Sequence, residues 1–328
     1  MLDDLPAHIV DFLSSSSVAQ YVTVSAAGIP IDTPVLVFPS EGLRSFDLAT
    51  GLSYPAKAER ARRNPNVALL IEGGPEDPVV TIAGKAAVRD ADLQANVDRY
   101  LSEAAYTLPH DPDWALARQA VWYWTRIIVE ITPAHVVWWD NPSAMDRQPL
   151  RWDAPAGTLY PQSDPAPPGA PSEPANWDTP PWQDLAEQAL GRNGIGHLSL
   201  MGSDGFPGCI RANSVAMAGG GFQLDLPKGM PWHAGGKASL TSNGIETFVG
   251  ELISESMMRV DRALPVFPMT IDMTQLWEPV PHTRSELMKR LEHETRRRNQ
   301  PIPVIPADRP PPTEGYRRRM AKLGLKIP

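Results

Sequence analysis

Short runs of apolar residues, broken by turn residues, dominate the first part of the chain. The runs 20–25, 32–38, 67–71 and 79–84 are rich in Val, Ile and Thr and are bounded by Gly, Pro and Asp. This composition is typical of β-strands. A short helix is predicted before Pro65, since Pro cannot continue a helix. Short strands with one small helix indicate a small β-barrel.

Segments with the apolar spacing of helices lie on both sides of these strands. Residues 1–16 predict a short helix with an apolar face, and residues 90–120 repeat apolar side chains every three or four positions. The runs 126–132 and 135–139 then return to a strand pattern. We therefore expect a mainly β fold with peripheral helices.

The same order of signals returns, less clearly, in the second half. A Gly-x-Pro turn follows the first strand in both halves, at Gly28 and at Gly205. Five pieces recur in order, and they lie at 195–201, 204–207, 222–226, 238–242 and 247–251. A looser match pairs 268–274 with the strand that starts at Arg126. An internal duplication explains this order, whereas two unrelated β-rich halves with common turn signals are the alternative.

Proline and charge divide the chain into four predicted parts. Prolines concentrate between residues 141 and 181, so neither regular helix nor sheet is expected there. The tail has an excess of Lys and Arg, although the net charge of the 328 residues is −8. The parts are a first barrel (1–140), a Pro-rich linker (141–181), a degenerate second barrel (182–280) and a basic helical and Pro-rich tail (281–328). We expect the tail to wrap the acidic body, and contact with an anionic ligand or partner is the alternative.

Composition excludes several classes of function. An acidic body argues against nucleic-acid binding, and no run approaches the roughly 18 apolar residues that a membrane-spanning helix needs. The single Cys209 and the acidic N-terminus favour a reduced, cytoplasmic protein. The histidines are scattered and give no zinc spacing, so no metal site is predicted.

One segment has the composition of a phosphate site. Lys57 stands at the start of the predicted helix, where free backbone N–H groups and a cation favour an anion. The hydroxyls of Thr50 and Ser53 precede it and can donate to the same oxygens. A solvated helix lysine is the alternative for Lys57.

Four motifs stand in a fixed order in the first half. Their residues are Gly28, Pro30, Thr33 and Pro34, then Thr50, Gly51, Ser53 and Lys57, then Arg63, Asn64, Pro65 and Val67, then Val80, Ile82 and Gly84. In this order they resemble the FMN-binding split β-barrel of the pyridoxamine 5′-phosphate oxidase-like superfamily, which also contains flavin and deazaflavin (F420) oxidoreductases. The resemblance covers about residues 18–140 well and 183–280 in degenerate form.

The resemblance implies where a flavin would lie. The ring would follow the strand after the Gly-x-Pro turn and take hydrogen bonds from backbone groups of Thr33, Val35 and Leu36. The partner barrel would cover it, here from within the same chain. The candidates for that cover are Arg211, Trp232 and His233.

Departures from the pattern narrow the expected activity. The vitamin B6 oxidases place an arginine where Thr33 stands, a lysine near Phe38 and a glutamine near Val79. We therefore do not expect vitamin B6 oxidation. The second half has 228–236 in place of the Lys57 segment, so one flavin per chain is expected. No catalytic side chain can be chosen, because the cofactor performs the electron transfer.

The sequence thus predicts two split β-barrels in one chain, which form a pseudo-dimer or assemble further as a homodimer. The expected function is an FMN-dependent oxidoreductase acting on a small organic molecule, with no nucleic-acid or membrane partner. F420 in place of FMN is the first alternative, a non-catalytic flavin or haem binder the second, and a structural β-protein with an empty site the third.

Overall fold

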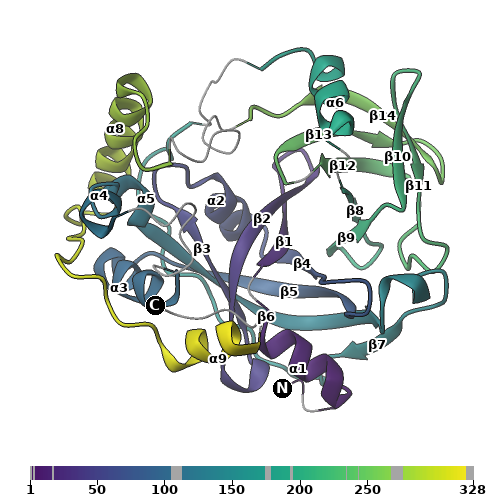
Figure 1. Ribbon diagram of the computed structural model, residues 1–328, viewed down its shortest axis with the longest axis horizontal. Coiled ribbons are helices and arrows are strands. Elements are labelled where there is room, and N and C mark those ends of the chain that lie inside the picture. The colour runs from purple at the N-terminus through teal and green to yellow at the C-terminus, as the bar shows by residue number, and fades with distance from the viewer. Residues whose placement is uncertain are drawn as a thin grey trace.

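The computed structural model describes residues 2, 4–16, 18–104, 113–173, 179–192, 195–233, 235–242, 244–266 and 276–322. Two β units lie side by side, and most helices surround the first unit (Figure 1). Within the described residues no helix is long and apolar enough to cross a membrane.

Six antiparallel strands form the first barrel. Their order is β3-β2-β1-β4-β5-β6, and pairing of β3 with β6 closes the barrel. Strand β7 (Leu150–Asp153) extends the sheet beyond β6, so the expectation of no regular sheet between residues 141 and 181 is wrong for these four residues. The six strands are β1 (Val18–Val24), β2 (Pro30–Pro39), β3 (Phe46–Gly51), β4 (Asn66–Ile71), β5 (Val79–Arg89) and β6 (Arg126–Trp139).

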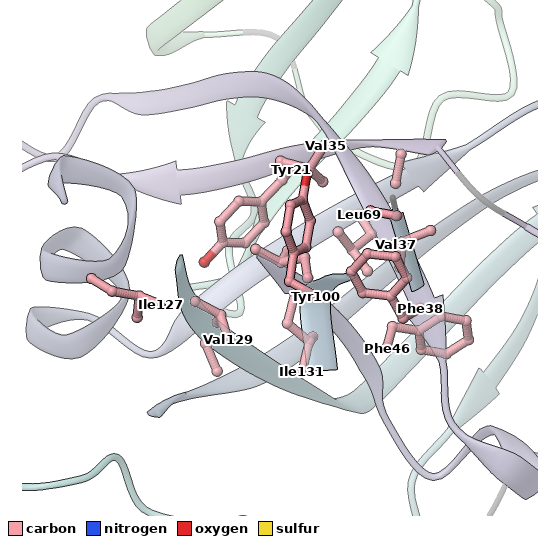
Figure 2. Packing of buried hydrophobic residues seen from close by; sticks show 14 of the residues in the cluster. Tyr21, Val35, Val37, Phe38, Phe46, Leu69, Tyr100, Ile127, Val129 and Ile131 are labelled. Carbon is pink, nitrogen blue, oxygen red and sulfur yellow. The ribbon is translucent and has the colours of Figure 1, made fainter. Parts of the chain in front are cut away.

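Alternating apolar side chains fill this barrel. One buried apolar cluster in its interior includes Val35, Val37, Leu69, Ile127 and Val129 (Figure 2). Because side chains alternate across a strand, the opposite face of the sheet is free for other contacts. In β1 and β4 that face packs on the second barrel through Val22, Ala68 and Leu70.

Most of the helices cover the first barrel at its ends and sides, whereas α6 packs on β10, β13 and β14 of the second barrel. In α3 the buried positions recur every three or four residues, as the sequence spacing predicts. The helices are α1 (Ala7–Ser14), α2 (Ala56–Arg63), α3 (Leu93–Ala104), α4 (Trp114–Ala117), α5 (Val121–Trp124), α6 (Trp182–Gly191), α8 (Pro281–Arg297) and α9 (Glu314–Lys322). Two 3₁₀ turns are η1 (Glu41–Leu43) and η2 (Pro142–Ala144).

The second barrel repeats the strand order of the first. Its order is β10-β11-β14-β13-β12-β8-β9. Strands β9 and β10 together hold the place of β2, because β9 pairs with β8 and β10 pairs with β11. The interruption at residues 212–213 leaves this sheet a half-barrel. The strands are β8 (Gly196–Met201), β9 (Pro207–Arg211), β10 (Ser214–Ala218), β11 (Gly221–Asp225), β12 (Gly236–Ser242), β13 (Glu246–Leu252) and β14 (Met257–Ala263).

Fine details also recur in the two barrels. The turn glycines Gly28 and Gly205 have φ angles of 73° and 81°, which non-glycine residues rarely adopt. A register shift falls at Gly84 between β5 and β6, and again at Gly250 between β13 and β14. The predicted fold of two split barrels in tandem is therefore confirmed.

One predicted correspondence cannot be placed. The segment 268–274, matched to the strand from Arg126, lies outside the described residues. The position of β6 in the second barrel is held by β14, which pairs with β13 as β6 pairs with β5.

The two barrels contact each other through equivalent elements. Strand β2 packs on β8 and β12, and β9 packs on β1 and β4. Asn66 of β4 donates to the carbonyl of Gly205 (2.9 Å), and Lys237 of β12 donates to that of Ala27. The contacts therefore follow a pseudo-twofold relation, as in a symmetric dimer.

The basic tail pairs with acidic groups of the body. Helix α8 lies beside α4 and α5 at one end of the first barrel (Figure 1). Its Glu294 is fully buried and accepts from Arg298 (2.6 Å), which also pairs with Asp90 (2.9 Å). Arg62 of α2 reaches the same Asp90 (2.7 Å). This network fixes α2 against the tail.

Candidate functional site

The predicted phosphate segment joins β3 to α2. Thr50 is buried in β3, Ser53 is buried in the connecting loop, and Lys57 is the second residue of α2. The first N–H groups of any α-helix lack intrahelical partners, so they remain available to a ligand. Helix α2 has no side-chain cap that could use them.

Lys57 lies in an environment that opposes its charge. Burial lowers its pKa to about 8, and the nearby charges of Arg60 and Arg126 contribute to the lowering, while Asp32 opposes it. The ammonium makes no hydrogen bond or salt bridge with any described residue. A bound anion would therefore stabilise the charged form of this buried, unpaired ammonium.

Two arginines accompany Lys57. Arg60 donates to the hydroxyl of Thr23 (2.7 Å), and burial lowers its pKa to about 10. Arg126 is 6% exposed, and its guanidinium lies 4.4 Å from the ring centre of Tyr100 and 4.2 Å from that of Tyr123. Such cation–π contacts hold the guanidinium in place. Neither arginine forms a salt bridge with a carboxylate in the described part of the chain.

Three hydroxyls of the first barrel are buried without a hydrogen-bond partner. They belong to Tyr21, Thr33 and Thr50. Tyr21 and Thr33 are register partners on β1 and β2, and Tyr21 lies within electrostatic range of Arg60. Buried polar atoms are normally paired. These unpaired hydroxyls, on the same barrel as the three cations, fit a site that is completed by a polar ligand.

The remaining predicted residues of this barrel differ in position. Ser53 donates its hydroxyl to the Leu287 carbonyl (3.1 Å), and its own carbonyl accepts from Arg290 (2.7 Å). Helix α8 therefore holds Ser53. Val35 is buried in the barrel core, and Leu36 is partly buried beside it.

The residues predicted as cover from the second barrel lie elsewhere. Trp232 and His233 line a cavity of about 120 Å³ whose walls include none of the predicted residues of the first barrel. Arg211 lies 4.0 Å from the carboxylate of Glu72, which is also 2.9 Å from Nε2 of His197. The predicted residues therefore fall into separate groups, with Thr33, Thr50 and Lys57 on the first barrel and Trp232 and His233 at the cavity.

Asp32 is a further group that the sequence did not single out. It is fully buried on β2, and burial raises its pKa to about 7 in spite of the opposing influence of His197, Thr241 and Lys57. Neither carboxylate oxygen has a hydrogen-bond partner of ordinary geometry. Arg126 is a second such group. Its only sequence signal is a charged residue at the start of an apolar strand.

No protein-family model and no curated protein matches the sequence. Among solved structures, a conserved hypothetical protein from Mycobacterium tuberculosis is 24% identical (TM-score 0.33) over 42% of this chain and 84% of that chain. A pyridoxamine 5′-phosphate oxidase-related, FMN-binding protein from Nostoc punctiforme is 16% identical (TM-score 0.31), over 40% and 81%. A structure named F420 reductase is 14% identical (TM-score 0.32), over 42% and 100%. Each of these matches covers less than half of this chain, and the fold described above rests on the strand order of the two barrels.

Proposed function

We propose that this chain is a flavin-dependent oxidoreductase that binds FMN with its phosphate at Lys57, Arg60 and Arg126. The observation that carries the proposal is the excess of positive charge at this site. Both arginines lie within electrostatic range of Lys57, and among the residues that the structure describes Asp32 is the carboxylate that opposes their effect. Burying unpaired charge is costly. A phosphate with nearly two negative charges would balance it.

The polar groups of the site also suit a phosphate ester. The start of α2 offers backbone N–H groups, and the hydroxyls of Tyr21, Thr33 and Thr50 have no other partner. Oriented N–H groups and cations are the usual components of phosphate sites. The Tyr100 and Tyr123 rings keep Arg126 in place before any ligand arrives.

When bound, FMN would supply the transfer of electrons to or from a small organic substrate. The task of this chain is then to bind the cofactor, to orient it and to exclude water. Lys57 and the arginines would hold the phosphate, and α8, which contacts Ser53, would close the loop from outside. The two barrels together would serve as the pseudo-dimer that such a site needs.

The test is a titration of the full-length protein with FMN, preceded by an absorbance spectrum of the purified protein. We expect one FMN per chain, and Lys57→Ala should weaken binding about tenfold or more, the loss typical of one charge-assisted contact. Lys289→Ala, on the exposed face of α8, is the matched control and should bind as the wild type does.

The same titration includes F420, because its phosphate would satisfy the same cations. If the protein binds F420 tightly and takes up no FMN, the proposed cofactor is F420 and the proposed phosphate site is unchanged. Absence of binding to either molecule, or an unchanged affinity in Lys57→Ala, would refute the proposed site. Binding without turnover by any electron donor would favour a non-catalytic flavin binder.

A further inference from the structure

A cavity of about 120 Å³ lies where the two barrels meet, apart from the cation site. Its first wall comes from β5, β6 and β7 and includes Thr81, His135 and Arg151. Its second wall comes from the turn between β8 and β9 and from the loop before β12. That wall includes Asp204 and Trp232.

The cavity follows from the difference between the two barrels. In the first barrel, α2 lies over the end of β1, where Arg60 donates to Thr23 and Arg63 donates to the Val24 carbonyl (3.4 Å). The second barrel has no helix between β11 and β12 in the part of the chain that the structure describes. The loop that carries Trp232 takes its place and leaves open space at the end of β8.

Specific contacts fix the walls of this cavity. A Cβ atom on Gly208 would lie 2.1 Å from the Trp232 ring, so glycine is required for the indole to rest against β9. His135 is held by Asp153, with 2.5 Å between Nδ1 and the carboxylate, and its ring meets Phe206 edge-on. The bond at Nδ1 leaves Nε2 as the nitrogen available to a ligand.

The charges of the cavity are balanced, which limits the class of ligand. Arg151 pairs with Asp153 (2.6 Å), a residue outside the lining, and Asp204 is the carboxylate of the lining itself. One oxygen of Asp204 accepts from the backbone N–H of Phe206 (3.1 Å), and the other accepts from no residue that the structure describes. An anion would be repelled by Asp204 and would find Arg151 already paired, whereas a neutral molecule with both N–H and C=O groups would find an acceptor in Asp204 and a donor in Arg151 or His135.

We propose that this cavity binds a neutral, planar, six-membered heterocyclic ring with an amide edge, which packs on Trp232 and bonds to His135 and Asp204. A cavity of about 150 Å³ in another protein accepts benzene, so a volume of about 120 Å³ limits the enclosed part of the ligand to a single ring. The Trp232 indole offers a flat surface for stacking, and stacking accepts many different planar rings. The site would act independently of the cation site around Lys57.

Calorimetric titration of the full-length protein with nicotinamide tests this inference, with nicotinate as the anionic counterpart of the same size. We expect saturable binding of nicotinamide, at least fivefold weaker binding of nicotinate, and at least fivefold weaker nicotinamide binding in Trp232→Leu. Trp182→Leu changes a tryptophan of α6 that packs on Phe222 instead, and should change the affinity by less than twofold.

Circular dichroism melts establish that each variant is folded, and His135→Gln replaces Trp232→Leu if the latter does not fold. Saturable binding that both wall variants weaken supports the inference. No saturable binding, equal or tighter binding of nicotinate, or wild-type affinity in a folded wall variant would overturn it. Because FMN binding is measured separately, failure here leaves the proposed function standing.

Discussion

Replacing Asp32 with Asn should stabilise the protein at alkaline pH and have little effect at acidic pH. The carboxyl is fully buried at the contact between the barrels, and burial raises its pKa from 3.8 to about 7. Between these values the folded state keeps the proton and the unfolded state loses it. Stability from this group is therefore complete below the unfolded pKa and is lost as the pH rises through the folded one.

The expected size follows from the difference between the two pKa values. A difference of one pH unit corresponds to ~1.4 kcal/mol, so ionisation of Asp32 costs about 4 kcal/mol by alkaline pH. Because part of this cost is already present near pH 5, the advantage of Asp32→Asn over the wild type should grow by about 2.5 kcal/mol from about pH 5 to about pH 8. The amide keeps the shape of the neutral acid, so no cavity is created.

The assay is urea unfolding of cofactor-free protein at several pH values, followed by tryptophan fluorescence. Asp225→Asn is the matched control, since Asp225 is an exposed aspartate on β11 and should leave the pH profile unchanged. If Asp32→Asn and the wild type show parallel profiles, Asp32 does not titrate in this range and the argument from its burial fails.

Three further changes test other parts of the structure. Burial and neighbouring cations depress the Lys57 pKa to about 8, so FMN affinity should stay constant just below that pH and fall by up to tenfold per pH unit above it. Fluorescence titrations with FMN at several pH values measure this profile. An affinity that does not change with pH would contradict a role for the Lys57 charge. Gly250→Ala places a Cβ 1.9 Å from a backbone carbonyl oxygen of β14 and should lower the free energy of unfolding by about 3 kcal/mol, whereas Gly220→Ala, with open space around it, should cost far less. Glu294→Gln removes one of the two buried carboxylates that pair with Arg298 and should lower the free energy of unfolding by about 3 kcal/mol in urea; a loss below about 1 kcal/mol would mean that the Asp90 contact suffices.

Local sequence signals predict most of the first barrel. Alternating apolar residues and turn glycines mark its strands, and Gly28 and Gly205 mark the duplication, because both positions need a positive φ angle. Lys57 can be recognised because its spacing from the start of a helix is a local property. The sequence did not predict that two strands, β9 and β10, replace β2 in the second barrel, because Asn213 is the one turn signal at the break between them.

Local sequence signals do not predict which residues strand pairing and barrel packing bring together at the site. Arg126 joins Lys57 only because β6 pairs with β3, and a lone arginine in an apolar strand does not reveal that pairing. The burial of Asp32 depends on strands of the other barrel. In the same way, no spacing could show that the cavity beside Trp232 is not lined by Lys57.

The union of two barrels in one chain gives each half freedom to diverge. Asp32 and Cys209 stand at equivalent positions, each four residues after the turn glycine. Asp32 faces the polar side chains His197 and Thr241, whereas Cys209 belongs to an apolar cluster. In a homodimer any substitution enters both halves of the contact at once, so a carboxyl on one side would always face a carboxyl on the other. Gene fusion removes that constraint, and one half can keep a charged site while the other acquires a different surface.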